Sequence, residues 1–275
     1  MTEQPVSLLT VDPDKPSLFL PTAMSRGPWA VEALYGGVGS ATFARSLEHL
    51  LPDQRLSRLT IDLLRPYPMA GFEVEVEVVR GGRSVTTTVG SAVDQSGRVV
   101  ARATALHQVP APVSATTTPD FSVPPGPDGL DEKPMTDGSL NSHGFDDVGR
   151  FIMTRAPVGG EPGCGRATVW LRIPDLIEGE YTTPWQRSVI AADCCNWFGR
   201  HAESSEVSFV NPDLTVHLHR DPVGEWIGLD VTSRWEANGV GLASAVLFDT
   251  GGPVGMAAQT LLLRPIAQPG VSAGY

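Results

Sequence analysis

The chain has 275 residues, of which 41% are hydrophobic and 19% are charged, a composition that is ordinary for a globular protein. Its length allows one large domain or two smaller ones, each with its own core. The formal net charge of −11 argues against a nucleic-acid-binding protein, because binding to phosphates requires a basic surface. No stretch approaches the roughly 18 consecutive apolar residues of a membrane span, so we expect none.

The N-terminal segment, MTEQPVSLLTVDPDKP, has no cationic start, no long apolar centre and no small-residue cleavage site. It does not resemble a secretory signal, and we expect a cytoplasmic protein. The cysteines Cys164, Cys194 and Cys195 lack the spacing of a metal site. The adjacent pair is expected to be two small buried side chains, and we expect neither a cofactor nor a bound metal.

Residues 111–149 are rich in Pro, Gly, Ser, Thr and Asp and include the run APVSATTTPDFSVPPGPDG. This composition disfavours both helices and strand pairing, so we interpret the segment as a linker or long crossover. The chain then divides into an N-terminal unit (residues 1–110), the linker (111–149), a C-terminal unit (150–268) and a tail (269–275).

The N-terminal unit shows a helical pattern followed by strands and tight turns. In chain order these are the pair Pro28-Trp29, a helical stretch to Leu51, a strand at 59–65, a β-rich stretch at 73–79, a Gly-Gly-Arg turn at 81–83, and an Asp-to-Gly turn at 94–97 before a closing strand. The C-terminal unit repeats this order. It has a helix from Pro184-Trp185 to about His201, a strand at 214–220, a β-rich stretch at 227–235, an Asn-Gly turn at 238–239, and an Asp-to-Gly turn at 249–252 before the last strand.

Equivalent residues of the two units are 155 positions apart, as in Leu59 and Leu214, and only the Pro-Trp pairs depart, by one. A constant offset of this kind indicates an internal repeat. A helix and an antiparallel sheet bury their apolar faces together when the sheet curves around the helix. We therefore expect an α+β protein with a tandem (double) hot-dog fold, in which each half is a long helix wrapped by a curved antiparallel sheet.

Asp193 falls on the apolar face of the second predicted helix. The residues that share this face are Val189, Ile190, Cys194, Trp197 and Phe198. A carboxylate there must be hydrogen-bonded, paired or reached by water, because burial is costly and raises its pKa. We interpret Asp193 as a site carboxylate. The alternatives are that this helix is more exposed or that Asp193 caps nearby backbone.

Gln259 and Asn211 are two further polar residues of interest in the C-terminal unit. Gln259 lies in the apolar stretch 256–263, where a buried amide needs hydrogen-bond partners; the alternative is an edge position that faces solvent. Asn211 precedes Pro212 just ahead of the repeated strand, where Asn commonly serves a turn.

The repeat provides an internal comparison for these three residues. Only the second unit carries the polar set, so we expect it to hold the site and the first unit to serve as scaffold and pocket wall. At the constant offset, Asp193 corresponds to Val38 (or to Gly37 with the one-residue slip), Asn211 to Leu56, and Gln259 to Thr104.

Short motifs occur in both units. Those of the first unit are Gly36-Gly37 before the helix, Arg65-Pro66 after the repeated strand, and the hairpin Arg80-Gly-Gly-Arg-Ser84. Those of the second are the helix with Asp193, the His219-Arg220 pair that ends a strand, and Gln259 ahead of Arg264. With these motifs, the chain outside the linker resembles the type II acyl-CoA thioesterases.

The resemblance implies a function in fatty acid metabolism, the hydrolysis of acyl-CoA to free fatty acid and CoA. In that family an Asp, a Thr or Ser, and a Gln jointly orient the attacking water. The Asp and the Gln correspond to Asp193 and Gln259, whereas Asn211 stands where the family has a hydroxyl residue. An amide can also hold water, so we expect Asp193 as base or water orienter, with Asn211 and Gln259 holding the water or the carbonyl oxygen. N–H groups at the N-terminal end of the helix could stabilise negative charge. The resemblance also implies a homodimer or higher homo-oligomer.

Other functions remain open at this point. A non-catalytic acyl-CoA or lipid-binding module would keep the pocket without efficient hydrolysis. A hot-dog enoyl-CoA hydratase would use an Asp and a nearby His, for which Asp213 and His217 are weak candidates. His217 and His219 alternate on one strand, but no further ligand completes a metal site. A serine hydrolase is disfavoured because no G-x-S-x-G motif occurs.

Overall fold

The computed structural model describes residues 7–114, 124–136, 148–156, 163–201 and 206–266. Strands dominate these residues. The first part of the chain provides β1 (Ser7–Asp12), β2 (Lys15–Pro21), β3 (Arg55–Leu63), β4 (Phe72–Arg80), β5 (Val85–Asp94) and β6 (Val99–Gln108). The remainder provides β7 (Glu132–Pro134), β8 (Met153–Arg155), β9 (Arg166–Arg172), β10 (Asp175–Ile177), β11 (Val207–Val210), β12 (Asp213–Leu218), β13 (Trp226–Trp235), β14 (Val240–Asp249) and β15 (Gly252–Pro265).

These strands join into a single sheet with the order β10-β1-β2-β4-β5-β6-β3-β12-β15-β14-β13-β9-β8-β7, and β11 pairs with β15. The antiparallel pairing of β3 with β12 connects the strands of the first half to those of the second. Inward residues alternate with outward ones along the long strands, as in β13, so each half buries one face of its sheet. The two halves therefore share one continuous layer that turns its apolar face inward.

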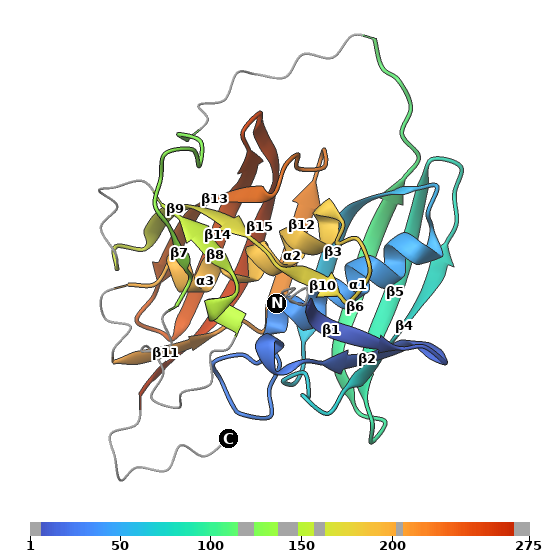
Figure 1. Ribbon diagram of the computed structural model, residues 1–275, viewed down its shortest axis with the longest axis horizontal. Coiled ribbons are helices and arrows are strands. Elements are labelled where there is room, and N and C mark those ends of the chain that lie inside the picture. Colours follow the sequence, from blue (N-terminus) through green and yellow to red (C-terminus); the bar gives the residue numbers. More distant parts are fainter. Residues whose placement is uncertain (1–6, 115–123, 137–147, 157–162, 202–205, 267–275) are drawn as a thin grey trace, which may run out of the picture.

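Two main helices lie inside this layer (Figure 1). They are α1 (Gly36–Leu50) and α2 (Pro184–Asp193), followed by the single turn α3 (Cys195–Phe198); short 3-10 turns occur at Ala23–Ser25 and Val148–Arg150. α1 packs on β3 and β4, α2 packs on β12 and β13, and the two helices pack against each other. A capping box of Thr183 and Gln186 with Pro184 in the first turn explains why α2 begins there.

The first predicted helix ends where it was expected, whereas the second is shorter than expected. Residues 26–35, which include the Pro28-Trp29 pair, form a closed loop in which the Gly27 N–H bonds to the Ala33 carbonyl at 3.0 Å, and α1 begins at Gly36. The second was expected to reach about His201. It ends at Asp193, because the Cys194 N–H turns back to the carbonyls of Ala191 and Ala192.

Several strands were not predicted. β1 and β2 lie in the N-terminal segment, and β1 pairs in parallel with β10, so the sheet is not wholly antiparallel. Within the segment expected to be a linker, β7 pairs with β8, and the Pro125 carbonyl accepts a 2.9 Å hydrogen bond from Trp170 Nε1. The idea that this composition prevents strand pairing is therefore wrong for part of the segment, while residues 115–123 and 137–147 lie outside the described residues.

The strand pairing also corrects the offset of the last strand. Thr104 lies opposite Thr60 on β3, whereas Ala258 lies opposite Thr215 on β12, an offset of 154. The cause is a shorter turn: Asp94 bonds to Arg98, but Asp249 pairs with Gly252. Gln259 therefore corresponds to Ala105 and not to Thr104.

The Pro-Trp pairs are not equivalent either. Trp29 precedes α1 and is 46% exposed, whereas Trp185 is inside α2 and is 3% exposed.

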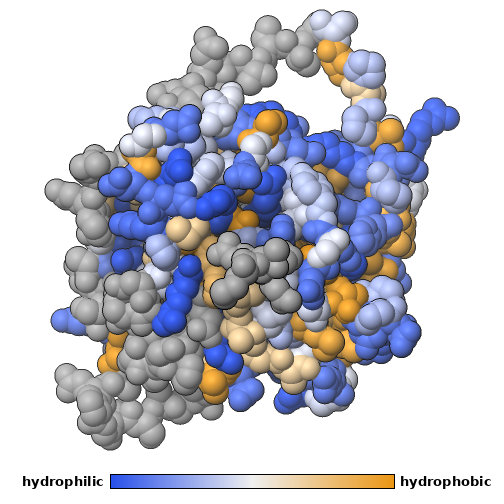
Figure 2. Space-filling view, viewed as in Figure 1, coloured by the Kyte–Doolittle hydropathy of each residue, from blue (hydrophilic) through white to orange (hydrophobic). Residues whose placement is uncertain are grey.

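The face in Figure 2 is mostly hydrophilic, with hydrophobic side chains in small groups between hydrophilic ones. Among the described residues, we find no helix that is long and apolar enough to cross a membrane.

Candidate active site

Asp193, Asn211 and Gln259 meet at one point. Asp193 Oδ1 accepts hydrogen bonds from Asn211 Nδ2 at 2.8 Å and from Gln259 Nε2 at 3.1 Å. Gln259 Nε2 also lies 3.3 Å from the backbone oxygen of Asp193. The fold thus brings together three residues that the sequence singled out, from the end of a helix, a loop and a strand.

Gln259 is placed by the alternation of β15. Ala257, Gln259 and Leu261 point inward while their neighbours are more exposed, and Gln259 is fully buried. The alternative of a solvent-facing edge position is wrong. A buried amide requires partners for its oxygen and its nitrogen, and Gln259 has both.

Asn211 is placed by an irregularity in the ladder. Val210 of β11 pairs with Leu262 and Thr215 of β12 with Ala258, so the four residues 211–214 lie opposite only three residues of β15. Such bulges redirect side chains. Leu56, the equivalent of Asn211 in the first half, lies next to a similar irregularity and is also buried, but it can only pack.

Asp193 is the last residue of α2 and is 4% exposed. Burial raises the pKa of Asp193 to about 6, and hydrogen bonds from Asn211, the Gly37 backbone, Tyr35 and Gln259 oppose this rise. A carboxyl with this pKa is largely ionised at pH 7 and is still basic enough to accept a proton. The alternative of an exposed helix is wrong.

The carboxylate faces the first turn of α1. A Cβ atom on Gly37 would lie 2.8 Å from Asp193 Cβ, and one on Gly36 would lie 3.2 Å from Asp193 Oδ2. Glycine therefore permits this close approach, and the N-terminal end of α1 directs its positive dipole at the carboxylate. The N-terminal end of α2, which was expected to supply the N–H groups, lies at the opposite end of that helix from Asp193.

Asn196 completes the cluster and was missed in the sequence. Its Nδ2 donates to Asn211 Oδ1 at 2.8 Å, and its backbone N–H donates to Gln259 Oε1 at 3.2 Å. The sequence signal that could have indicated it was an amide side chain within the apolar run CCNWF, one helical turn after Asp193.

The two amide groups mainly hold the carboxylate. Asn211 Nδ2 donates to Asp193 and, at 3.3 Å, to the Asp213 carbonyl, while Gln259 Nε2 donates to the side chain and backbone of Asp193. Each NH₂ group has two hydrogens, so both are engaged. The site can therefore fix a basic carboxylate beside the N-terminal end of a helix, an arrangement suited to activating water.

Other candidates do not form a comparable site. His217 and His219 are exposed, and Asp213 Oδ1 accepts the Thr260 N–H at 2.8 Å. Cys194 and Cys195 are fully buried, as expected. Tyr35 is a further neighbour, with its hydroxyl 3.3 Å from Cys194 Sγ.

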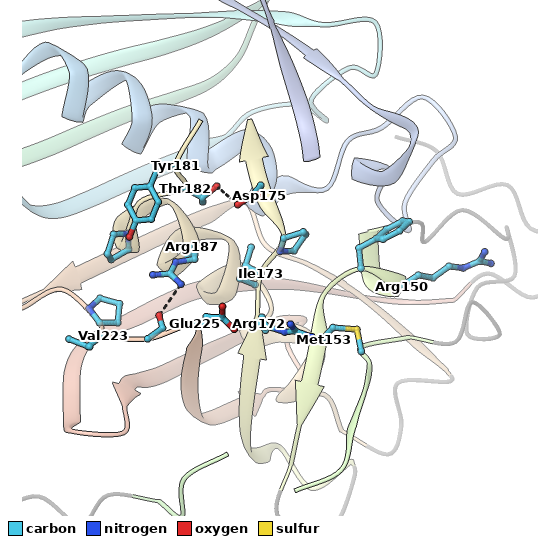
Figure 3. Close-up of a pocket in the computed structure, with 15 residues that line it drawn as sticks. Arg150, Met153, Arg172, Ile173, Asp175, Tyr181, Thr182, Arg187, Val223 and Glu225 are labelled. Carbon is cyan, nitrogen blue, oxygen red and sulfur yellow. Dashed lines mark hydrogen bonds between the residues drawn. The ribbon is translucent and has the colours of Figure 1, made fainter. Parts of the chain in front are cut away.

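A cavity of about 1230 Å³ lies at the opposite end of α2 (Figure 3). Its lining includes Tyr181, Thr182, Asp175 and Arg187, and Arg187 Nη1 donates to the Gly224 carbonyl at 2.9 Å. Asp193 does not line this cavity. This cavity and the polar cluster are therefore different places in the fold.

Profiles of known families match both halves of the chain. The acyl-CoA thioesterase N-terminal domain matches residues 25–108, and the acyl-CoA thioesterase C-terminal domain matches residues 122–263. The chain therefore belongs to the acyl-CoA thioesterase family, which confirms the prediction from its motifs. It is an enzyme with thioesterase activity. No curated protein sequence shows significant similarity to it.

Solved structures show the same fold. A thioesterase-like protein of Novosphingobium aromaticivorans has a TM-score of 0.71 at 18% identity, covering 94% of this chain and 99% of that one. Acyl-CoA thioesterase II TesB2 of Mycobacterium marinum has a TM-score of 0.63 at 20% identity, covering 89% of this chain and 98% of that one. A protein of unknown function with a hot-dog fold from Alicyclobacillus acidocaldarius has a TM-score of 0.67 at 15% identity, covering 94% of this chain and 96% of that one. At these identities the similarity shows the hot-dog fold alone.

Proposed function

We propose that this enzyme hydrolyses acyl-CoA esters to a free fatty acid and CoA, with Asp193 as the base and Asn211 and Gln259 as the residues that hold it. The observation that carries the proposal is the convergence of both amides on Asp193 Oδ1, at 2.8 and 3.1 Å, in a buried cluster that faces the first turn of α1.

In the proposed reaction, Asp193 takes a proton from a water molecule as that water attacks the thioester carbonyl carbon. The carbonyl oxygen becomes negative, and N–H groups at the N-terminal end of α1 stabilise it. The carbon–sulfur bond then breaks. The CoA thiolate leaves as a good leaving group, and the proton held by Asp193 neutralises it. Water and thioester give acid and thiol, with no other reactant.

The roles of the amides differ from those first expected. Both N–H groups of each amide donate to Asp193 or to a backbone oxygen. The amides therefore support the carboxylate rather than hold a water. Hydrogen bonds to the ionised form lower the pKa of Asp193 against the effect of burial. Without them the pKa of the carboxyl would be higher, and less of it would be ionised and able to act as a base.

We also propose that the fold is a tandem double hot dog. Each half has one helix inside four consecutive antiparallel partners, β4-β5-β6-β3 and β13-β14-β15-β12. Both ladders have an irregularity just before the Asp-to-Gly turn, between Ala92 and Val93 in one and between Leu247 and Phe248 in the other. These positions differ by 155, the offset of the repeat, which supports duplication of one unit.

A homo-oligomer and a cytoplasmic location stay predictions. The first has some support in exposed aliphatic side chains that gather on the outer face of β14 and β15, where Val240 lies opposite Leu262 and Val246 opposite Met256. Such a patch suits contact with a second copy of the chain.

The second candidate is an acyl-CoA-binding module without efficient hydrolysis. It is favoured by Asn211, which stands in place of a hydroxyl residue. Incubation of the purified protein with acyl-CoA esters of graded chain length, followed by measurement of free thiol, separates the two. Thiol release above background supports hydrolysis. Tight binding of the esters without release at any chain length would instead establish the module.

A further inference from the structure

Asn196 lies between the two amides of the cluster and touches both. It is in the first turn of α3, directly after the break that follows Asp193, and is 7% exposed. Its side chain donates to Asn211 and its backbone to Gln259. It has no direct hydrogen bond to Asp193 among the described contacts, so any influence on the carboxylate passes through its two partners.

These contacts set the direction of each amide. A backbone N–H can only donate, so the side of Gln259 that faces Asn196 must be its oxygen, and its NH₂ group must face Asp193. For Asn211, the Asp213 carbonyl can only accept, which places the NH₂ group on the side of Asp193. The Asn211 oxygen is then left for Asn196 Nδ2, at 2.8 Å.

The direction matters because a reversed amide would present its oxygen to a carboxylate. A donor lowers the pKa of the carboxyl, whereas a facing oxygen lone pair repels the ionised form and raises it. Asn211 is the foremost of the hydrogen bonds that oppose the effect of burial on the pKa of Asp193. The residue that holds Asn211 in place therefore helps to keep the pKa of Asp193 down.

We infer that Asn196 is a positioning residue, which fixes the orientation of Asn211 and Gln259 so that their NH₂ groups face the Asp193 carboxylate. The inference rests on the proposed function of Asp193. The side chain of Asn196 acts on Asn211, and its backbone acts on Gln259, so substitution of the side chain removes only the first of these two supports.

The test is the pH dependence of kcat/KM for thiol release by the full chain, in the wild type, Asn196→Ala, Asn211→Ala and the double variant. We expect Asn196→Ala to move the acidic limb of the profile upward by about one pH unit, the size of the loss of one hydrogen bond to a charged group. Such a shift lowers kcat/KM by roughly tenfold at pH 5 and by about twofold at pH 7. Since the side chain acts through Asn211, the double variant should match Asn211→Ala alone.

An unchanged acidic limb, or losses that add in the double variant, would overturn the inference and leave Asn196 a merely structural residue. The isosteric variant Asn196→Asp serves where Asn196→Ala does not fold. The carboxylate of this variant accepts a hydrogen bond where Asn196 donates one, so it should turn the Asn211 amide around and move the acidic limb of the pH profile further upward. An acidic limb at the same pH as in the wild type would again overturn the inference. Asp193→Asn, measured in parallel, separates the two claims: full activity in that variant refutes the proposed base, whereas an inactive Asp193→Asn with a wild-type-like Asn196→Ala refutes only the role of Asn196.

Discussion

Thr60 on β3 and Thr215 on β12 lie directly opposite each other in the antiparallel ladder, with their Oγ1 atoms 3.2 Å apart. They are also separated by 155 positions, the offset of the internal repeat. In an antiparallel pair, a local two-fold axis passes between directly opposed residues. The axis that would exchange the two halves therefore runs through this pair, and it places the first turn of α1 beside the last turn of α2.

The contact between Gly37 and Asp193 should be sensitive to a single methyl group. An added Cβ on Gly37 would meet Asp193 Cβ at 2.8 Å and Tyr35 Cε1 at 2.9 Å, so Gly37→Ala must displace the carboxylate. We expect kcat to fall by roughly tenfold or more, since small misplacements of a catalytic group are costly. The control is Gly126→Ala, where a Cβ would meet nothing within 4 Å. Equal activity of Gly37→Ala and wild type would argue against a site at this junction.

Two substitutions of Asn211 should separate chemistry from packing. Asn211→Thr restores a hydroxyl donor of the kind found in the family and should keep most of the activity. Asn211→Leu copies the buried Leu56 of the first half, which can only pack, and should lower kcat/KM by roughly tenfold to a hundredfold. Steady-state thiol release measures both. If Asn211→Leu were as active as Asn211→Thr, Asn211 would have no polar role.

Gln259→Met should remove both donors to Asp193 while it keeps much of the volume. We expect the acidic limb of the activity profile to move upward, because Gln259 helps to hold the pKa of Asp193 down. Thr260→Val is the matched control on the outer face of the same strand, since the Thr260 contact to Asp213 uses only its backbone N–H. A profile for Gln259→Met that coincides with that of Thr260→Val would contradict the assigned role.

Glu48 on α1 predicts a pH dependence of stability rather than of catalysis. Burial raises the pKa of Glu48 to about 7, against hydrogen bonds from Gln186 and Thr183 at 3.0 and 2.9 Å. The folded state binds the proton more tightly than the unfolded state. The stabilisation is therefore complete below the ordinary pKa of 4.5 and is lost as the pH rises through about 7.

The variant Glu48→Gln should remove this part of the pH dependence. Its free energy of unfolding in urea should differ little from that of the wild type at low pH and exceed it at pH 8 by about 1–3 kcal/mol, following the value of a pKa shift of this size. Parallel pH curves for the two proteins would show that Glu48 ionises in the folded state as it does in water.

Much of the fold could be predicted from local patterns, and the errors have physical causes. Turns such as Asn238-Gly239 and the alternation of β13 are local, and both occur where they were expected. The start of α1 depends on a loop closed by the Gly27 contact to Ala33, and the pairing of β1 with β10 joins residues that are far apart in the chain. Neither leaves a periodic signal.

The site was accessible because buried polar residues are unusual. Asp193 and Gln259 stood out in apolar surroundings, and Asn211 stood out only by comparison with Leu56. Asn196 was missed because its role depends on the break at Cys194, which turns α3 toward the amides. The one-residue difference between the Asp-to-Gly turns likewise became visible only in the strand register.

The most direct test of this account is the rate of thiol release from acyl-CoA between pH 4.5 and 8.5, for the wild type, Asp193→Asn and Tyr181→Ala. Tyr181 lines the large cavity at the other end of α2, is 76% exposed, and serves as the control. We expect the wild type and Tyr181→Ala to gain activity as the pH rises through about 6, where Asp193 ionises, and then to level off. Asp193→Asn should be at least roughly a hundredfold slower throughout. Equal rates for Asp193→Asn and the wild type would contradict the assignment of Asp193 as the base.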